Sequence, residues 1–230
     1  MTDSQATLRT DAVLFDLDGT LVDTAPDMVA VLHELQMAYG GSPVDYATAR
    51  SYVSNGALGL VGLAFPTAEP DFRDRLYHEY LDRYELTVCS KSEVFPGLLD
   101  ILEELEKRGC PWGVVTNKPA RMTNPLLEKL GLGNRVSCAI SGDTLPQRKP
   151  DPTPLLHAST LLQVASANTV YVGDALRDIH AGRAAGMKTI AAAYGYIVSG
   201  DDPLSWNADF IVRSASELAQ MLRTATQQES

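Results

Sequence analysis

Four short segments carry most of the side chains that could do chemistry, and the first is rich in carboxylates. Residues 16–24 read Asp-Leu-Asp-Gly-Thr-Leu-Val-Asp-Thr and follow an apolar run. Asp16 therefore ends a hydrophobic segment, where an isolated charge is costly, and Asp18 points the same way if the backbone stays extended. Gly19 permits a sharp turn. Alone, the segment is equally well read as an Asx-rich turn; an EF-hand loop is excluded because Leu21 stands where that loop needs glycine.

The other three segments are weaker signals when each is taken alone. Thr116 and Asn117 close a second apolar run and offer phosphate donors, although a helix cap is the more usual role. Lys149 lies in Arg-Lys-Pro-Asp-Pro, where two prolines stiffen the chain, but a solvated lysine is the default. Asp174 and Asp178 follow a third apolar run. They share a face if a helix begins there, and helix capping is the alternative.

Together the segments indicate a metal-assisted phosphoryl site. If the apolar runs are strands that end at one edge of a sheet, four carboxylates meet there: Asp16, Asp18, Asp174 and Asp178. Repelling carboxylates need a cation or raised pKa values, and Mg²⁺ commonly bridges protein carboxylates and a substrate phosphate. Thr116 and Lys149 would add a donor and a positive charge. The sequence therefore predicts Mg²⁺ as cofactor.

The elements that must position these residues alternate between strand-like and helix-like patterns. Continuous apolar runs predict buried strands over residues 12–16, 112–116, 136–140, 169–173, 189–193 and 210–213. Helical stripes lie between them, over residues 98–105, 122–130 and 155–162. This alternation predicts an α/β fold with a doubly wound parallel sheet of Rossmann type.

One long interval breaks the alternation. From residue 27 to residue 93 the pattern is helical throughout, with no good strand. A crossover of this length predicts an inserted helical cap domain over residues 27–93, with the core domain formed by residues 1–26 and 94–230. Additional helices packed on the core are the alternative.

Composition narrows the class of partner and the compartment. The 230 residues carry a formal net charge of -10, which argues against nucleic-acid binding. Three scattered cysteines indicate neither a disulfide framework nor a zinc site. The first residues are polar and no 18-residue apolar stretch follows. We expect a cytoplasmic protein without a membrane partner, a monomer or weak homodimer, that acts on a small phosphate monoester.

The four segments resemble, in order and spacing, the motifs of the haloacid dehalogenase superfamily. The residues that carry the resemblance are Asp16-x-Asp18-Gly-Thr20, Thr116, Lys149 and Gly173-Asp174-x-x-x-Asp178. Asp23-Thr24 followed by a helical insert is similar to the phosphoglycolate-phosphatase-like branch. The resemblance covers about residues 12 to 213 and implies a phosphatase.

The resemblance also implies a role for each residue. Asp16 would attack phosphorus, and Asp18 would protonate the leaving alcohol and then activate water. The Asp16 side chain, the Asp18 carbonyl and Asp174 would hold the cation, with Asp178 ordering its surroundings. Lys149 and Thr116, beside Asn117, would bind the phosphoryl oxygens.

In the helical insert, Ser54-Asn55-Gly56 is the segment that we expect to lie over the phosphate-binding site. Arg50 is a candidate contact, against the alternative of a solvated helix position.

The sequence argues against two of the other activities found on this fold and leaves two more open. Asp18 argues against a dehalogenase, and the absence of lysine from residue 23 to residue 90 argues against a phosphonate hydrolase. A phosphohexomutase and a phosphate-binding regulator without turnover stay open.

For the substrate, residues 194–209 resemble the corresponding loop of bacterial N-acetylmuramic acid 6-phosphate phosphatases. The sequence therefore favours N-acetylmuramic acid 6-phosphate as the substrate, with 2-phosphoglycolate as the alternative. For the loop itself, the alternative to a role in substrate recognition is that Trp206 packs on the edge of the core.

Overall fold

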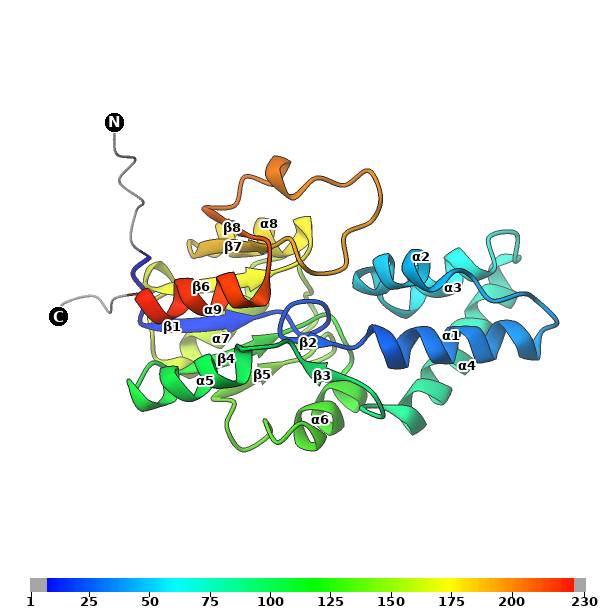
Figure 1. The fold of residues 1–230 in the computed structure, drawn as a ribbon, viewed down its shortest axis with the longest axis horizontal. Helices are drawn as coiled ribbons and strands as arrows, with labels where there is room; N and C mark the ends of the chain where they lie inside the picture. Colours follow the sequence, from blue (N-terminus) through cyan, green and yellow to red (C-terminus); the bar gives the residue numbers. More distant parts are fainter. Residues whose placement is uncertain (1–7, 226–230) are drawn as a thin grey trace.

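A computed structural model of the chain describes residues 8–225. Its centre is a six-stranded sheet in the order β5-β4-β1-β6-β7-β8, in which every neighbouring pair is parallel (Figure 1). The strands are β1 (Ala12–Phe15), β4 (Trp112–Val115), β5 (Cys138–Ile140), β6 (Thr169–Gly173), β7 (Lys188–Ala192) and β8 (Phe210–Val212). The predicted fold class is confirmed, with strand boundaries that differ by at most two residues.

Helices cover both faces of this sheet. Alternate residues of β1 enter different clusters, Val13 and Phe15 on one face and Ala12 and Leu14 on the other. The first face is covered by α5 (Leu98–Lys107), α6 (Ala120–Lys129) and α9 (Ala215–Thr224). The second is covered by α7 (Thr153–Leu162) and α8 (Leu176–Ala184). Burial on both sides explains why the strands read as continuous apolar runs.

The order of the strands creates a switch point beside β1. The chain passes from β1 to β4 and β5 on one side, and then returns to β6, β7 and β8 on the other. Ligands of open α/β sheets bind outside the carboxyl ends of strands at such a point. Asp16, Thr116 and Asp174 directly follow β1, β4 and β6.

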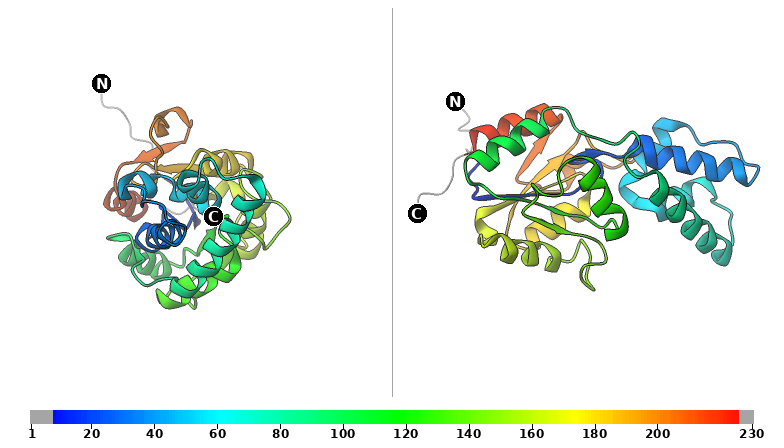
Figure 2. Two further views of the ribbon diagram at one scale, coloured as in Figure 1. Left: turned by 90° about the vertical axis from the view of Figure 1, so that its right-hand side faces the viewer. Right: turned by 90° about the horizontal axis from the view of Figure 1, so that it is seen from below.

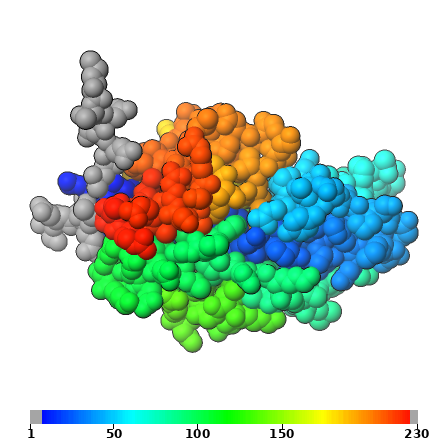
Figure 3. Space-filling model, in the orientation of Figure 1, coloured from blue at the N-terminus to red at the C-terminus, as the bar shows by residue number. Residues whose placement is uncertain are grey.

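A group of helices lies beyond this end of the sheet (Figures 1 and 2). We call residues 25–87 the insert. Its helices are α1 (Ala25–Ala38), α2 (Tyr46–Ser51), α3 (Gly56–Ala64) and α4 (Pro70–Thr87), with a 3-10 turn, η1 (Val53–Asn55), before α3. Two more 3-10 turns, η2 (Ser166–Asn168) and η3 (Pro203–Ser205), lie in connections of the core. In the space-filling view the insert abuts the rest of the molecule (Figure 3).

The chain enters and leaves the insert through two short strands that form a small antiparallel sheet. Strand β2 (Val22–Asp23) pairs antiparallel with β3 (Glu93–Val94). Two-residue strands have no periodicity, so the sequence pattern did not predict them. The pair joins the two linkers close to the predicted boundaries at residues 26 and 94. The division into core and cap domains with those boundaries stays a prediction.

Among the described residues, no helix is long and apolar enough to cross a membrane. The polar N-terminal residues that entered the prediction of compartment lie largely outside the described range.

Candidate active site

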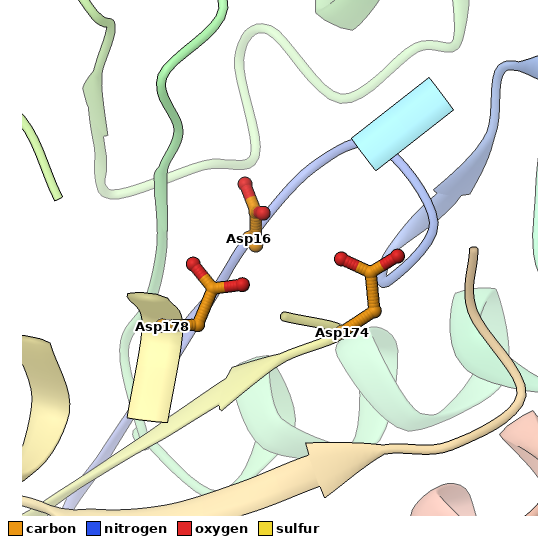
Figure 4. Close-up of side chains that lie close together, drawn as sticks. All are labelled: Asp16, Asp174 and Asp178. Atoms are coloured by element: carbon orange, nitrogen blue, oxygen red, sulfur yellow. The ribbon is translucent and has the colours of Figure 1, made fainter. Parts of the chain in front are cut away.

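Three carboxylates lie close together at the carboxyl end of the sheet. Asp16 follows β1, Asp174 follows β6 and Asp178 lies in the first turn of α8 (Figure 4). Each offers an oxygen within 4.8 Å of the others, and all three residues are buried. The Asp16 backbone N–H still donates to Val172 in the sheet, so β1 and β6 fix this residue directly.

Glycine makes this approach of chain segments feasible. Gly19 has φ +78°, which side-chain-bearing residues rarely adopt, and a Cβ there would collide with the Asp174 carboxylate. A Cβ on Gly173 would in turn collide with Asp178. The glycines of both acidic motifs therefore serve the close packing of the carboxylates.

The ammonium group of Lys149 neutralises part of the negative charge of this cluster. Its Nζ lies 3.0 Å from Asp16 Oδ1 and 2.8 Å from Asp178 Oδ1. It also donates to Val115 O and to the Tyr171 hydroxyl. The side chain is fully buried and does not line the cavity described below. In this geometry Lys149 orients the carboxylates, whereas the sequence prediction has it binding phosphoryl oxygens.

The cluster has the electrostatics of a cation site. Burial, together with the charges of Asp16 and Asp178, raises the pKa of Asp174 to about 8. Burial also raises the pKa of Asp178, against the attraction of Lys149. Asp174 Oδ1 is buried and has no hydrogen-bond partner within residues 8–225. A divalent cation would satisfy this oxygen and relieve the repulsion, so the residues present fit a metal.

Asp18 lies at the same cavity but outside the cluster. Its carboxylate forms an ion pair with Lys118, whose Nζ is 2.9 Å from Oδ1 and 3.2 Å from Oδ2. The Thr24 hydroxyl donates to Asp18 Oδ1 at 2.6 Å. The structure therefore brings together three of the four predicted side chains. The strand ends at Phe15, and a turn follows in which the Leu21 and Val22 N–H groups donate to the Leu17 carbonyl, so Asp18 does not continue the line of the strand.

Thr116 and Asn117 also lie at the cavity. The Thr116 hydroxyl accepts a hydrogen bond from the Lys118 N–H at 3.2 Å. The Asn117 amide donates to the Lys149 carbonyl and accepts from the Lys149 N–H. Asn117 thus ties the loop after β4 to the loop that carries Lys149.

The insert reaches the cluster through Ser54. Its hydroxyl donates to Asp174 Oδ2 at 2.6 Å, and Ser54, Asn55 and Gly56 all line the cavity. Arg50 is not among the lining residues. Its guanidinium lies 2.7 Å from Asp23 Oδ1. Asp23 belongs to residues 23–25, where the chain enters the insert and which we call the hinge, and it is within reach of the last turn of α2.

Sequence reasoning missed three cations at the cavity, Lys118, Arg148 and Arg177. Arg177 lines the cavity and donates to the Ser54 carbonyl at 2.7 Å. The positions of Lys118 and Arg177 carried a signal, because Lys118 directly follows Thr116-Asn117 and Arg177 directly precedes Asp178.

The loop of residues 194–209, on which the prediction of the substrate rests, lies outside the cavity. Its Trp206 packs against Ile179 and Ala191. None of residues 194–209, all of them described, lines the cavity.

The cavity has a volume of about 320 Å³ and two unlike walls. The core wall carries Asp16, Asp18, Thr116, Asn117, Lys118, Arg148 and Arg177. The insert wall is mainly apolar or aromatic: Met28, Val53, Ala57, Leu58, Tyr77, Tyr80, Leu81 and Tyr84. Such a site can hold a charged group against the core and an organic group against the insert.

Comparison with known proteins identifies the family. Residues 13–192 match the haloacid dehalogenase-like hydrolase family. The chain is 44% identical over 207 residues to a phosphoglycolate phosphatase of Xanthomonas campestris, which covers 90% of this chain and 94% of that protein. It is 42% identical over 224 residues to an N-acetylmuramic acid 6-phosphate phosphatase of Pseudomonas aeruginosa, with 95% and 97% covered.

The fold is also that of a solved structure. A predicted phosphoglycolate phosphatase from Haemophilus somnus superposes with a TM-score of 0.82 at 24% identity, covering 92% of this chain and 97% of that one. This likeness supports the fold, while the family model and the sequence relatives establish kinship. The chain therefore belongs to the haloacid dehalogenase-like hydrolases, as a phosphatase in the branch that includes phosphoglycolate and N-acetylmuramic acid 6-phosphate phosphatases.

Proposed function

We propose that this chain hydrolyses a small phosphate monoester in two steps, through an aspartyl-phosphate on Asp16. The observation that carries the proposal is the buried cluster of Asp16, Asp174 and Asp178, at a cavity with space for an organic group. Covalent catalysis divides a slow displacement into two easier ones. Uncatalysed phosphate-monoester hydrolysis is among the slowest reactions that enzymes accelerate.

The hydrogen bonds of Asp16 suit a nucleophile. Its Oδ1 accepts from the Leu17 N–H at 2.7 Å and lies 3.0 Å from Lys149 Nζ. Among residues 8–225, no protein donor binds Oδ2. The carboxylate is therefore oriented through one oxygen and keeps the other available for phosphorus.

The remaining roles follow the family motifs and the positions of the side chains. Asp18, at the cavity wall, gives its proton to the departing ester oxygen and later takes one from the attacking water. Asp16, Asp174 and the Asp18 carbonyl would hold Mg²⁺, and Asp178 would order its surroundings. When bound, the cation supplies positive charge against the phosphoryl oxygens. Thr116 supplies a hydroxyl donor at the same wall.

The favoured substrate is N-acetylmuramic acid 6-phosphate. A cavity of about 320 Å³ lies at the lower end of the roughly 300–1,000 Å³ typical of drug-sized ligands. An amino sugar would use the apolar insert wall, which the small glycolate group of 2-phosphoglycolate leaves largely unfilled. The relatives with the two activities are about equally similar to the chain, so 2-phosphoglycolate is the alternative substrate.

The direct test compares the two esters on one enzyme preparation with saturating Mg²⁺. We expect a higher kcat/KM for N-acetylmuramic acid 6-phosphate, because this ratio reports differential binding of the transition state. N-acetylglucosamine 6-phosphate serves as a control for the lactyl group. A clear preference for 2-phosphoglycolate would overturn the choice of substrate, and no phosphate release from any ester would overturn the activity.

A further inference from the structure

The hydroxyl group of Tyr196, in the loop after β7, contacts the start of the insert. It accepts hydrogen bonds from the Thr24 N–H at 2.7 Å and the Ala25 N–H at 2.9 Å. It donates to Asp23 Oδ1 at 2.8 Å. Burial and the charge of Asp23 raise the pKa of Tyr196, so the hydroxyl keeps the proton that it donates. One buried core side chain thus contacts three consecutive hinge residues.

These contacts substitute for a missing helix cap. The first N–H groups of a helix have no partner within the helix, and the N-cap side chain usually accepts from one of them. Thr24 is the N-cap of α1, but it makes no such bond. Its hydroxyl donates to Asp18 instead. The Tyr196 oxygen therefore caps α1 from a distant part of the chain, and Asp23 Oδ1 accepts from the same Ala25 N–H at the longer distance of 3.3 Å.

Arg50 completes the contact from within the insert. Its Nη1 lies 2.7 Å and 3.0 Å from the two carboxylate oxygens of Asp23. Its guanidinium carbon lies 4.9 Å from the centre of the Tyr196 ring. Asp23, Arg50 and Tyr196 form a three-residue contact between hinge, insert and core, which we call the hinge latch.

The other side of Tyr196 contacts the carboxylate cluster. Its backbone N–H donates to Asp174 Oδ2 at 2.8 Å, the same oxygen that accepts from the Ser54 hydroxyl. Tyr196 belongs to the core, whereas Ser54 belongs to the insert. The Ser54 hydrogen bond therefore depends on where the insert lies, and the hinge latch fixes the start of the insert relative to the core.

We propose that Tyr196 is a positioning residue whose hydroxyl places the insert so that Ser54 completes the surroundings of the Asp174 carboxylate. The affinity for the divalent cation is then set partly by a side chain outside the cavity. The inference rests on the proposed function only in taking Asp174 as a ligand of Mg²⁺. It assigns the hinge latch a role in metal binding as well as in holding the insert.

The test measures Mg²⁺ affinity by calorimetry on Tyr196→Phe, which removes only the hydroxyl. Groups that orient a metal ligand typically contribute about 10- to 100-fold in metal affinity. We expect a loss of about tenfold, with a circular dichroism spectrum like that of the wild type. With p-nitrophenyl phosphate, the Mg²⁺ concentration for half-maximal rate should rise, while kcat at saturating Mg²⁺ changes little. Unchanged Mg²⁺ affinity would overturn the proposal.

A double-mutant cycle tests the route through Ser54. Ser54→Ala alone should weaken Mg²⁺ binding by a similar factor. In that background Tyr196→Phe should add little, because residues that act through one contact are not additive. Fully additive losses would show that the Tyr196 hydroxyl acts independently of Ser54 and would overturn the proposed route.

Two further variants separate the hinge latch from general damage. Tyr194→Phe is the matched control, because the Tyr194 hydroxyl lies in the same loop and donates to Thr20 O in the core. It should leave Mg²⁺ affinity unchanged; an equal loss there would overturn the proposal. Arg50→Gln leaves the buried tyrosine intact and should weaken Mg²⁺ binding by about threefold, the scale of a partly exposed ion pair. No loss would remove Arg50 from the hinge latch.

The calorimetric measurement does not need turnover. A wild-type protein that binds Mg²⁺ but hydrolyses no phosphate ester would refute the proposed function alone. Normal hydrolysis together with an unchanged affinity in Tyr196→Phe would refute this inference alone.

Discussion

The two walls of the cavity differ in how their side chains are held. On the core wall, Asp16, Asp18 and Lys118 are fixed by ion pairs and hydrogen bonds to residues of other strands and loops. On the insert wall, residues such as Leu58 and Tyr77 present mainly carbon to the same space. Leu58 is 62% exposed. One wall is built for a single geometry, and the other offers a surface that several organic groups could use.

This difference separates two questions about the enzyme. Charged groups with fixed partners act on the phosphoryl group, which all candidate substrates share. Apolar contacts act on the leaving group, in which the candidates differ. Substitutions on the core wall should therefore lower turnover of every ester, with any difference between esters following the basicity of the leaving group. Substitutions on the insert wall should change the ratio between esters whose leaving groups differ in size and shape. The four predictions below test this division.

The largest effect is expected from Asp16→Asn. An amide is a poor nucleophile and a weaker Mg²⁺ ligand, so phosphate release from every ester should fall by at least about a thousandfold. The fold should persist, as measured by thermal unfolding. Glu34→Gln, an equivalent change at an exposed position of α1, is the control. Residual activity of more than a few per cent under saturating Mg²⁺ would exclude Asp16 as the nucleophile.

Removal of the metal should stop turnover of all esters alike. EDTA should abolish phosphate release and Mg²⁺ should restore it, while Ca²⁺ should fail because it takes more ligands at longer distances. The measurement is the rate with each cation after dialysis against the chelator. Full activity in the metal-free protein would contradict the assignment of the Asp174 cluster as a cation site.

Lys118→Met should have an effect that depends on the leaving group. Methionine can still pack against Tyr84, whose ring centre lies 4.5 Å from Lys118 Nζ, but it cannot hold Asp18. We expect kcat/KM to fall about tenfold for phenyl phosphate. For p-nitrophenyl phosphate the loss should be smaller, because its leaving group needs less help from an acid.

These two esters share the same ring, so leaving-group basicity is the main difference between them. Asp18→Asn should abolish the selective effect of Lys118→Met. Equal losses for both esters would mean that Lys118 acts on the phosphoryl group and not through Asp18.

The smallest effect is expected from the insert wall. Leu58→Ala should lower kcat/KM for N-acetylmuramic acid 6-phosphate by about fivefold, which is part of the contribution of a fully buried leucine because Leu58 is half-open to solvent. The value for 2-phosphoglycolate should stay nearly constant. If both esters lost activity in proportion, the insert wall would not discriminate between leaving groups.

The sequence by itself determined the sheet and the acidic motifs. Continuous apolar runs predicted all six strands of the parallel sheet, because strands covered on both faces have no polar side. Residues that follow such strands must gather at one end of the sheet, so Asp16 and Asp174 could be placed together without coordinates. The helical character of the insert was also predicted, because apolar residues recur at helical spacing in two of its segments, which the structure forms as α1 and α4.

Contacts between distant segments were decided only by the tertiary structure. No local sequence pattern predicts that Lys118 pairs with Asp18 or that Tyr196 caps α1. Nor does any local pattern predict that Arg50 pairs with Asp23 instead of lining the cavity. The two-residue pair of β2 and β3 is likewise too short to leave a pattern. Spacing along a strand or helix is a local property that periodicity reveals. Pairing across the hinge depends on how the insert lies on the core, which many weak contacts fix together.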